Sequence, residues 1–326
     1  MKALIYDGPQ SMEFRDTVDP VPQSGDHLIR VEAVGICGSD MHGYLGHDAR
    51  RPAPLILGHE AAGVVVDGVR ANERVTVNPL VPCGHCPACL AGRENICPNR
   101  ELISMPPREG AFAQYLTMPD ENLVVVPEDV PLDKAALTEP MAVSWHAAKL
   151  ALAALHPKME KRALVIGGGA IGVTSGLCLK AMGCEDVTIV EPNAARCAYV
   201  NERCGLHAVE STTDDYPLVI DAVGYAVTRA LASERAEPGG VIAHIGLGEG
   251  DGGLDIRRMT LQEITFIGTY CYTSIDFREA AQAIFEGRLG PLDWFETRHL
   301  SDGFKAFQDL HAGQVAAPKI VLTPWS

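Results

Sequence analysis

The chain has 326 residues, 47% of them apolar and 21% charged, which is typical of a globular protein with two domains. Acidic side chains number 42 against 27 basic ones, so the net charge is −15. Such an acidic chain has no general attraction for phosphate backbones or anionic lipid, and composition argues against nucleic-acid and membrane partners.

The chain begins with a short apolar run, Met1–Tyr6, which predicts a strand rather than a secretory signal. The longest uncharged stretch, 163–179, is marginal in length for a membrane span and contains five glycines, so a buried strand, turn and helix fit it better. Four of the ten cysteines crowd into fifteen residues with metal-ligand spacing. Reduced thiols and a cytoplasmic location are therefore expected rather than disulfides.

The first 140 residues contain short β-type runs separated by turn residues, which predicts a small barrel-like β domain. These runs are 28–31, 62–66, 74–77 and 123–126. From Leu132 to Leu155 the chain is rich in alanine and has no glycine. This segment predicts a helix that bridges two domains, with a possible break around Pro140.

From Arg162 onward, buried-strand patterns alternate with helical segments, and another helix is expected at 277–286. The continuous apolar runs are typical of parallel strands covered on both faces, so this half predicts a doubly wound α/β sheet. The runs are 163–166, 187–190, 218–220, 241–245 and 264–267. Near the end, Val321 and Leu322 are apolar and could return to the first domain.

Four cysteines stand in the spacing C-x2-C-x2-C-x7-C: Cys83, Cys86, Cys89 and Cys97. Four thiolates close a tetrahedral zinc site with no open position, which makes the predicted zinc structural. Such an ion would hold a loop that has little apolar content of its own. Disulfides or free thiols are the alternatives. His85, inside the cluster, is expected to be a solvated loop residue and not a fifth ligand.

Three further segments carry residues suited to an open, reactive metal site. They are the run Gly35-Ile36-Cys37-Gly38-Ser39-Asp40-Met41-His42, the run Gly58-His59-Glu60, and the run Thr138-Glu139-Pro140 at the domain junction. Each is weak alone, because a single cysteine is usually a small buried apolar residue and a His-Glu pair usually lies on the surface.

A glycine run fits G-x-G-x-x-G: Gly167-Gly168-Gly169-Ala170-Ile171-Gly172. It follows a buried strand and opens a helical segment, which is the context that a dinucleotide site requires. Gly167 permits the tight turn, Gly169 the approach of the pyrophosphate, and Gly172 the contact between helix and strand.

The next predicted strand ends at Glu191, 19 residues after Gly172. An acid there can bind the ribose diol and repel a 2′-phosphate, which predicts NAD over NADP. An ordinary acid at a helix start is the alternative, and Arg196 nearby could soften the preference. Val223 and Ile245 follow later strands and are expected to approach the cofactor.

Taken together, these motifs resemble the zinc-containing medium-chain dehydrogenase/reductase family, most closely its sorbitol and threonine dehydrogenase branches. They stand in family order along essentially the whole chain. The resemblance implies a GroES-like catalytic domain at 1–143 and 291–326, with a zinc lobe at 80–100. It also implies a Rossmann domain that binds NAD at 144–290.

By the same resemblance, Cys37 and His59 bind a catalytic zinc, and Glu60 and Glu139 are carboxylates that coordinate it or hold its water. A second cysteine near Glu139, found in classical alcohol dehydrogenases, is missing here, which favours the polyol-type branch. Zn²⁺ with one thiolate and one carboxylate is neutral, and a second carboxylate would weaken it as a Lewis acid. We therefore expect one glutamate to bind while the other hydrogen-bonds water or substrate.

In the family, the position of Ser39 takes the alcohol proton, and His42 then passes it toward solvent. A turn-capping serine and a surface histidine are the alternatives for these two residues. The expected reaction is hydride transfer from a secondary alcohol or polyol to NAD, with one catalytic and one structural zinc per subunit. A zinc-free reductase of the same fold and a zinc-ribbon interaction protein are the competing functions.

The chain departs from its relatives in two shortened loops, near 67–69 and 211–216, and a familiar Gly-Asp-Arg-Val turn reads Asn72-Glu73-Arg74-Val75. Arg50 and Arg51 could meet an anionic substrate, although a solvated loop is the expected interpretation. Homodimers or homotetramers are usual in the family, and the strand at 264–267 could form an edge shared between subunits.

Overall fold

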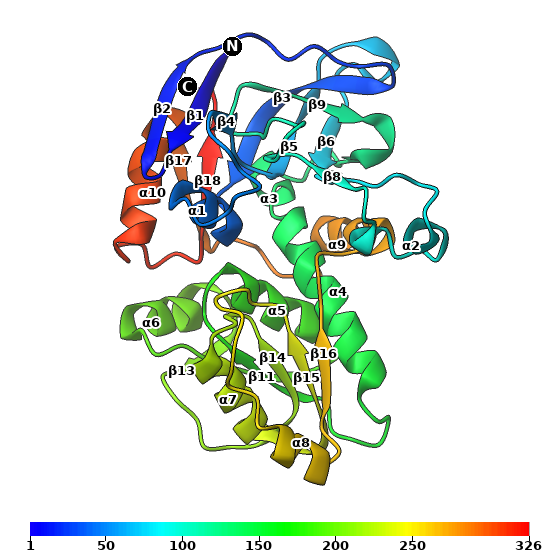
Figure 1. Cartoon of the computed structure of the whole chain (residues 1–326), viewed down its shortest axis with the longest axis vertical. Coiled ribbons are helices and arrows are strands. Elements are labelled where there is room, and N and C mark those ends of the chain that lie inside the picture. Colours follow the sequence, from blue (N-terminus) through cyan, green and yellow to red (C-terminus); the bar gives the residue numbers. More distant parts are fainter. Residues whose placement is uncertain (326) are drawn as a thin grey trace. The chain divides into compact units, whose positions relative to one another are not determined.

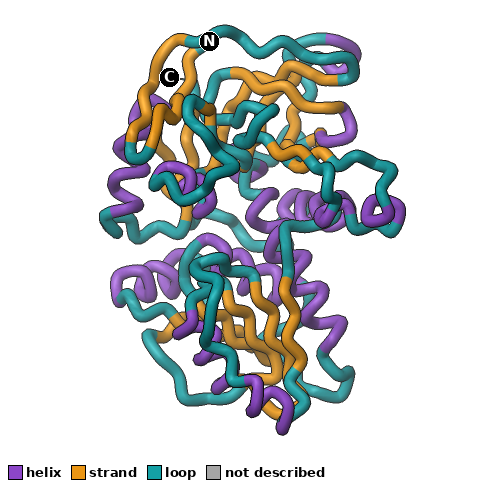
Figure 2. The backbone as a smooth tube through the Cα atoms, viewed as in Figure 1, coloured by secondary structure: helices purple, strands orange, loops and turns teal. Residues whose placement is uncertain are grey.

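The computed structural model describes residues 1–325, which form two compact units (Figures 1 and 2). Unit 1 comprises Met1–Glu139, Thr273–Phe285 and Phe295–Ser326, and unit 2 comprises Pro140–Tyr272 and Glu286–Trp294. Among the described helices, none has both the length and the apolar character needed to cross a bilayer.

Unit 1 consists mainly of short strands joined by turns, as its β-type runs predict. Its strands are β1 (Lys2–Gly8), β2 (Ser11–Asp16), β3 (Asp26–Gly35), β4 (Leu55–Ile56), β5 (Glu60–Val65), β6 (Arg74–Val77), β7 (Leu80–Val81), β8 (Glu101–Leu102), β9 (Tyr115–Pro119), β10 (Leu123–Val125), β17 (Phe295–His299) and β18 (Lys319–Thr323). Its helices are α1 (Gly38–Tyr44), α2 (Pro87–Leu90), α3 (Leu132–Ala135), α9 (Ser274–Phe285) and α10 (Gly303–His311).

The largest sheet of unit 1 has the order β10-β6-β5-β3-β18-β17, and β9 also pairs with β3. Strand β3 holds this sheet together, since Ile29 and Val31 point into the core while Arg30 between them is exposed. Strand β18 pairs antiparallel with the end of β3, with Val321 opposite Gly35. The chain's last strand therefore lies in the same sheet as strands from the first 140 residues.

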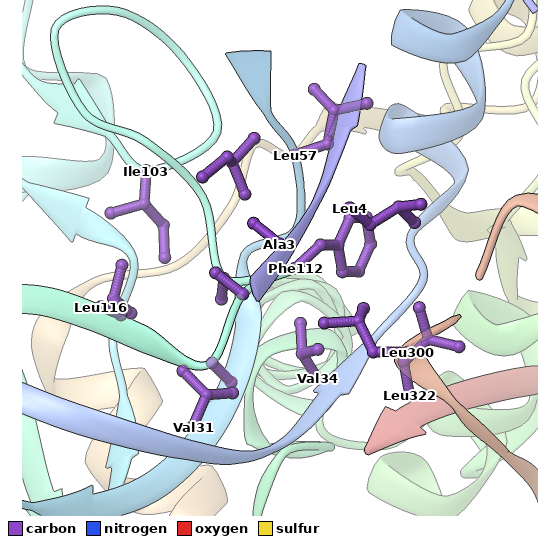
Figure 3. Packing of buried hydrophobic residues seen from close by; sticks show 14 of the residues in the cluster. Ala3, Leu4, Val31, Val34, Leu57, Ile103, Phe112, Leu116, Leu300 and Leu322 are labelled. Carbon is purple, nitrogen blue, oxygen red and sulfur yellow. The ribbon is translucent and has the colours of Figure 1, made fainter. Parts of the chain in front are cut away.

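The core of unit 1 draws on segments from both ends of the chain (Figure 3). Leu4, Phe112, Leu300 and Leu322 are fully buried, and the backbone of Leu4 donates a 2.8 Å hydrogen bond to the carbonyl of Phe112. Each such side chain contributes about 1.5–3 kcal/mol by leaving water. This core fixes β3 and β18 side by side, and their adjoining ends carry the residues of the candidate site.

The bridging helix begins later than its alanine-rich sequence suggests. Helix α3 ends at Ala135, and α4 (Thr138–Ala154) starts three residues further on. The break therefore precedes Pro140, which occupies the first turn of α4, where its missing N–H has no helical partner to lose.

Helix α9 departs from the predicted domain boundary, which placed all of 144–290 in the dinucleotide half. In the structure, α9 packs on α3 and belongs to unit 1. The backbone N–H of Ser274 donates a 2.6 Å hydrogen bond to the side chain of Glu94, a residue of the cysteine-rich lobe. The sequence pattern identifies α9 as a helix but carries no information about this distant partner.

Unit 2 is a doubly wound sheet with strand order β13-β12-β11-β14-β15-β16 and every pairing parallel, in agreement with its alternating pattern (Figure 2). The strands are β11 (Arg162–Ile166), β12 (Asp186–Val190), β13 (His207–Val209), β14 (Tyr216–Asp221), β15 (Ala236–His244) and β16 (Thr265–Gly268). The helices that follow them are α5 (Ala170–Ala181), α6 (Ala194–Arg203), α7 (Ala226–Arg235) and α8 (Ile256–Leu261). Strands β12 and β13 are added on one side of β11 and β14 to β16 on the other, so the strand order reverses between β11 and β14, where this architecture binds ligands.

Both shortened loops form tight connections. Strands β5 and β6 are joined through a single 3-10 turn, Gly68–Arg70, after which Asn72 adopts a left-handed φ of 71°. Asparagine tolerates this conformation better than most residues, so it can stand where relatives have glycine. Strand β13 leads to β14 through a short loop without an intervening helix.

Candidate active site

The candidate site of unit 1 begins where β3 ends and α1 starts. Cys37 is the N-cap of α1, and its backbone N–H donates a 3.0 Å hydrogen bond to Asp40 Oδ2. The side chain of an acid at the third helical position thus reaches back to the start of the helix, which fixes the turn that carries the thiol.

Asp40 also orients the histidine of the site. Its Oδ1 lies 3.3 Å from Nδ1 of His59 and accepts a 3.2 Å hydrogen bond from the backbone N–H of Gly58. Asp40 is completely buried. A carboxylate on one ring nitrogen fixes the tautomer and leaves Nε2 for a metal, which is the usual arrangement behind a metal-binding histidine.

The ligand atoms of Cys37, His59 and Glu60 all lie within 4.8 Å of one another. Ligand atoms on one tetrahedral zinc are about 3.3–3.8 Å apart, so small side-chain adjustments bring these three onto a single ion. Glu60 Oε2 is buried and has no hydrogen-bond partner within residues 1–325. A thiolate, an imidazole and a carboxylate with a free oxygen form a donor set that fits zinc.

The surroundings of His59 favour a positive charge. Burial by itself would lower the pKa of His59, but the carboxylate of Asp40 and the thiolate of Cys37 together raise it well above its usual range. Without a metal the imidazole therefore holds a proton in this pocket. A bound cation would provide the same charge, which is a second reason why the residues fit a metal ion.

The predicted proton-relay residues lie one turn apart on α1. Ser39 Oγ is 3.5 Å from His59 Nε2, so the hydroxyl stands beside the side of the ring that faces the ligand group. His42 is exposed on the same helix, three residues later, where residues share a face.

Glu139 has a different place from that of Glu60. It is 7% exposed in the first turn of α4 and is not part of the three-residue group of mutually close ligand atoms. Its charge is nevertheless felt in the same pocket, because it contributes to raising the pKa of the buried Lys319. Of the two predicted carboxylates, only Glu60 stands with Cys37 and His59.

The four cysteines of the lobe are gathered as their spacing predicts. The Sγ atoms of Cys83 and Cys97 are 3.5 Å apart, those of Cys86 and Cys89 are 3.5 Å apart, and those of Cys83 and Cys89 are 4.0 Å apart. Four sulfurs around one zinc at 2.3 Å would be about 3.8 Å apart. His85 is exposed and stays outside this group, with Nδ1 2.6 Å from the carbonyl of Cys83.

Two thiols of the lobe titrate very differently. A hydrogen bond from the backbone N–H of His85 lowers the pKa of Cys83 to about 6, whereas desolvation and the neighbouring thiols raise the pKa of Cys89 to about 12. In the metal-free lobe Cys83 is therefore the thiolate that a metal meets first at neutral pH.

In unit 2 the glycine run forms the turn between β11 and α5. Gly167 has a left-handed φ of 102°, and a Cβ there would lie 2.4 Å from a methyl group of Val223. A Cβ on Gly172 would lie 1.7 Å from the carbonyl oxygen of Gly167, so α5 contacts the turn directly. Gly169 is the N-cap of α5 and has open space within 4 Å, where a pyrophosphate can approach the first turn at Ala170 and Ile171.

Glu191, which is predicted to bind the ribose diol, braces this turn in the structure. Its Oε2 accepts a 2.9 Å hydrogen bond from the backbone N–H of Gly168, and its Oε1 accepts one of 2.9 Å from Asn193. Arg196 approaches the same carboxylate at 3.5 Å. Each carboxylate oxygen keeps a second lone pair, so the ribose diol remains a possible partner.

The other two predicted cofactor residues follow adjacent strands at the same edge of the sheet. The carboxylate of Asp221 accepts a 3.0 Å hydrogen bond from the backbone N–H of Val223, and its carbonyl accepts one of 3.0 Å from Ile245. Asp221 thus holds together the turns after β14 and β15. The fit of this edge to a dinucleotide rests on the glycine cradle, with these turns alongside it.

The expectation of a solvated loop is wrong for Arg51 and holds for Arg50. Arg51 is 3% exposed, and its guanidinium contacts Asp48 and donates to Ser104 Oγ at 3.3 Å and Ser39 Oγ at 3.4 Å. Arg50 is exposed and pairs with the same Asp48 at 2.8 Å. The sequence signal is identical for the two arginines, and only the fold turns one of them inward.

Comparison with known proteins agrees with this geometry. Residues 23–128 match the model of the alcohol dehydrogenase GroES-like domain, and residues 170–286 match that of the zinc-binding dehydrogenases. The chain is 32% identical to sorbitol dehydrogenase of Bacillus subtilis, over 84% of this chain and 83% of that protein. It is 29% identical to L-galactonate-5-dehydrogenase of Escherichia coli K12, over 89% and 88% of the two chains.

Among solved structures, an alcohol dehydrogenase from Escherichia coli CFT073 complexed with NADH superposes with a TM-score of 0.89. That protein is 25% identical in sequence, and the match covers 99% of both chains. The fold, the two metal-ligand groups and these relatives define the class of protein. The chain belongs to the zinc-containing medium-chain dehydrogenase/reductase family and is a zinc-dependent oxidoreductase of the alcohol dehydrogenase type.

Proposed function

We propose that this protein oxidises a secondary hydroxyl of a sugar alcohol or sugar acid, with NAD as the hydride acceptor. The observation that carries the proposal is the convergence of Cys37, His59 and Glu60 with Ser39 beside them. The names of two relatives, a sorbitol dehydrogenase and an L-galactonate-5-dehydrogenase, support a polyhydroxylated substrate. An alcohol dehydrogenase structure that contains NADH supports the cofactor.

In this proposal Cys37, His59 and Glu60 hold the catalytic zinc, and the four cysteines of the lobe hold a structural one. When bound, zinc supplies the Lewis acidity that lowers the pKa of the substrate hydroxyl, and NAD supplies the acceptor for the hydride. Asp40 keeps the imidazole of His59 in the orientation that presents Nε2. Glu139, outside the ligand group, is proposed to hydrogen-bond water or substrate.

Ser39 would accept the hydroxyl proton in this mechanism, and the side chain of His42 would deliver it to solvent. Arg51 donates a hydrogen bond to Ser39 Oγ, so the serine's own proton is free to point elsewhere. His42 is exposed, which suits a group that exchanges protons with water.

In unit 2, the turn at Gly167 and Gly169 is proposed to receive the pyrophosphate, with Gly172 allowing the close helix contact that shapes it. The carboxylate of Glu191 is proposed to select NAD over NADP, with Arg196 beside it. We also propose a cytoplasmic location, because the thiolate ligands need reducing surroundings, and a homodimer or homotetramer.

Two competing functions receive less support. A zinc-free reductase of the same fold would have no use for the group formed by Cys37, His59 and Glu60. A zinc-ribbon interaction protein would not need a dinucleotide turn, and the family match extends through residues 170–286.

The test incubates the zinc-loaded protein with NAD and a panel of polyols, sugar acids, sugar phosphates and amino alcohols, and follows reduced cofactor by absorbance. Cys37→Ser should abolish a positive reaction and leave one zinc per chain instead of two. Cys184→Ser is the matched control, because its hydroxyl can donate to the carbonyl of Lys161 as the thiol does now at 3.0 Å. Full activity of Cys37→Ser would refute the metal assignment. Silence across the panel with NADH binding intact would place the substrate outside the polyol branch.

A further inference from the structure

A buried lysine lies directly beside the candidate metal ligands. Lys319 is the first residue of β18 and is 3% exposed. Its Nζ donates a 2.6 Å hydrogen bond to Glu60 Oε1 and a 2.9 Å hydrogen bond to the carbonyl of Ile36, the residue before Cys37. Glu60 itself is completely buried, so this ion pair is sheltered from water on both sides.

The two oxygens of Glu60 have different surroundings. Oε1 is occupied by Lys319, whereas Oε2 is buried and has no hydrogen-bond partner within residues 1–325. Oε2 rests against Gly35, which faces Glu60 across the β3–β5 ladder, and a Cβ on Gly35 would lie only 1.9 Å from this oxygen. The lysine on one oxygen and the glycine under the other hold the carboxylate in one orientation.

Charge explains why a cation is needed here. A zinc ion with the thiolate of Cys37 and the carboxylates of Glu60 and Glu139 nearby carries a net charge of about −1 when His59 is neutral. An uncompensated charge in a buried site is costly, and an anionic centre is a weaker Lewis acid. The ammonium of Lys319 brings the set to neutrality.

Lys319 lies within electrostatic range of three acidic side chains, those of Glu60, Cys37 and Glu139. These three residues stand at the start of β5, at the N-cap of α1 and in the first turn of α4, so Lys319 faces the whole anionic set and not a single partner.

We propose that Lys319 is a positioning residue of the catalytic metal centre, which holds Glu60 by Oε1 and neutralises it so that Oε2 alone is offered to the ion. This inference rests on the ligand set proposed above. It adds a residue that touches neither substrate nor cofactor in the proposed mechanism and acts through Glu60. It also explains how two glutamates can stand near one zinc without making the centre anionic.

The test compares four cobalt-loaded proteins: the wild type, Lys319→Met, Glu60→Gln and the double variant. Cobalt reports its ligands through its visible absorption bands, and cobalt-loaded Cys37→Ser serves as the blank for the four-cysteine site. We expect Lys319→Met to shift the bands of the catalytic cobalt, because Glu60 is then free to turn both oxygens toward the metal. In the Glu60→Gln background the same change should produce less than a quarter of that shift.

Metal retention gives a second readout. Removing a positive charge from the pocket should slow the release of catalytic cobalt to a chelator several-fold in Lys319→Met, whereas a merely structural lysine would speed its release when lost. Lys319→Arg, which keeps the charge, should restore the wild-type release rate. Lys305→Met, which changes an exposed lysine of α10 paired with Asp309, is the matched control and should change nothing.

Unchanged bands in Lys319→Met, or an equal shift in the Glu60→Gln background, would overturn the proposal. If Lys319→Met is too unstable to load with cobalt, the stability of the double variant Glu60→Gln, Lys319→Met tests the coupling of the two residues, because it removes both charges together. The double variant should then be more stable than Lys319→Met, and equal instability would mean that the two residues are not coupled. If Cys37→Ser removes no cobalt at all, the ligand set itself is wrong and this inference falls with it.

Discussion

Alanine substitutions at Gly169 and Gly172, which add one methyl group each, should separate an effect on cofactor binding from an effect on folding. A Cβ on Gly172 would stand 1.7 Å from the carbonyl oxygen of Gly167 and 2.8 Å from its carbon, against an ordinary contact of about 3.4 Å. To restore an ordinary contact, helix α5 would have to move away from the Gly167 carbonyl by about 1.7 Å. Overpacking of this kind costs about 1–3 kcal/mol, and against backbone we expect the upper end.

The better helix propensity of alanine returns about 1 kcal/mol, so Gly172→Ala should lose about 2 kcal/mol of unfolding free energy. Gly169→Ala meets open space, and alanine at an N-cap costs less than about 1 kcal/mol relative to glycine. Its methyl group would occupy the proposed approach of the pyrophosphate. NADH binding should weaken at least tenfold, which is about 1.4 kcal/mol.

Chemical denaturation followed by circular dichroism gives the first quantity, and titration of NADH fluorescence gives the second. The expected pattern is a crossed one: Gly172→Ala unstable, and Gly169→Ala stable but poor in binding. Wild-type NADH affinity in Gly169→Ala would refute the placement of the pyrophosphate. Wild-type stability in Gly172→Ala would refute the argument that backbone contact fixes this glycine.

Three further predictions concern charge. In the metal-free protein at pH 7, iodoacetamide should alkylate Cys83 before Cys89. The rate at Cys83 should fall as the pH drops through about 6, because a thiol with a lowered pKa loses its reactive thiolate only below that value. Mass spectrometry after short labelling measures this, with zinc-loaded protein as the protected control, and faster labelling of Cys89 would contradict it. Arg51→Gln removes a buried cation and should cost about 3 kcal/mol of unfolding free energy. Arg50→Gln removes the exposed partner of the same Asp48 and should cost less than about 1 kcal/mol. Equal melting temperatures of the two variants would show that burial does not distinguish the two arginines. Glu191→Gln should reduce the preference for NAD over NADP about tenfold in binding titrations, and an unchanged ratio would mean that the carboxylate only braces its turn.

Much of the fold follows from patterns that are local in the sequence. The run 74–77 is strand β6, and four buried runs of the second half are strands β11, β12, β14 and β16 within a residue or two, whereas β15 starts five residues before its predicted run. A strand that is covered on both faces must be apolar throughout, so its own residues identify it. The four cysteines are equally local, because fifteen residues contain every ligand of that group.

The remaining features depend on contacts between distant segments. Glu60 and Lys319 are 259 residues apart, and no short motif indicates that a lysine near the end of the chain contacts a glutamate near the beginning. Arg51 is buried because Asp48 and Ser104 surround it, and its twin Arg50 is not. Asp40 belongs to the motif that identifies the site, yet its role behind His59 becomes visible only when β5 lies beside α1.

The split composition of unit 1 sets an order of events during synthesis. A chain that emerges from the ribosome presents Cys37, His59 and Glu60 first, and the lysine that neutralises Glu60 appears only after all of 140–272 has been made. Unit 2, nearly continuous, is therefore free to fold before the earlier half is complete. The ligand residues are therefore made long before their counter-charge, and we expect Glu60 to be held by Oε1 only once β18 has paired with β3.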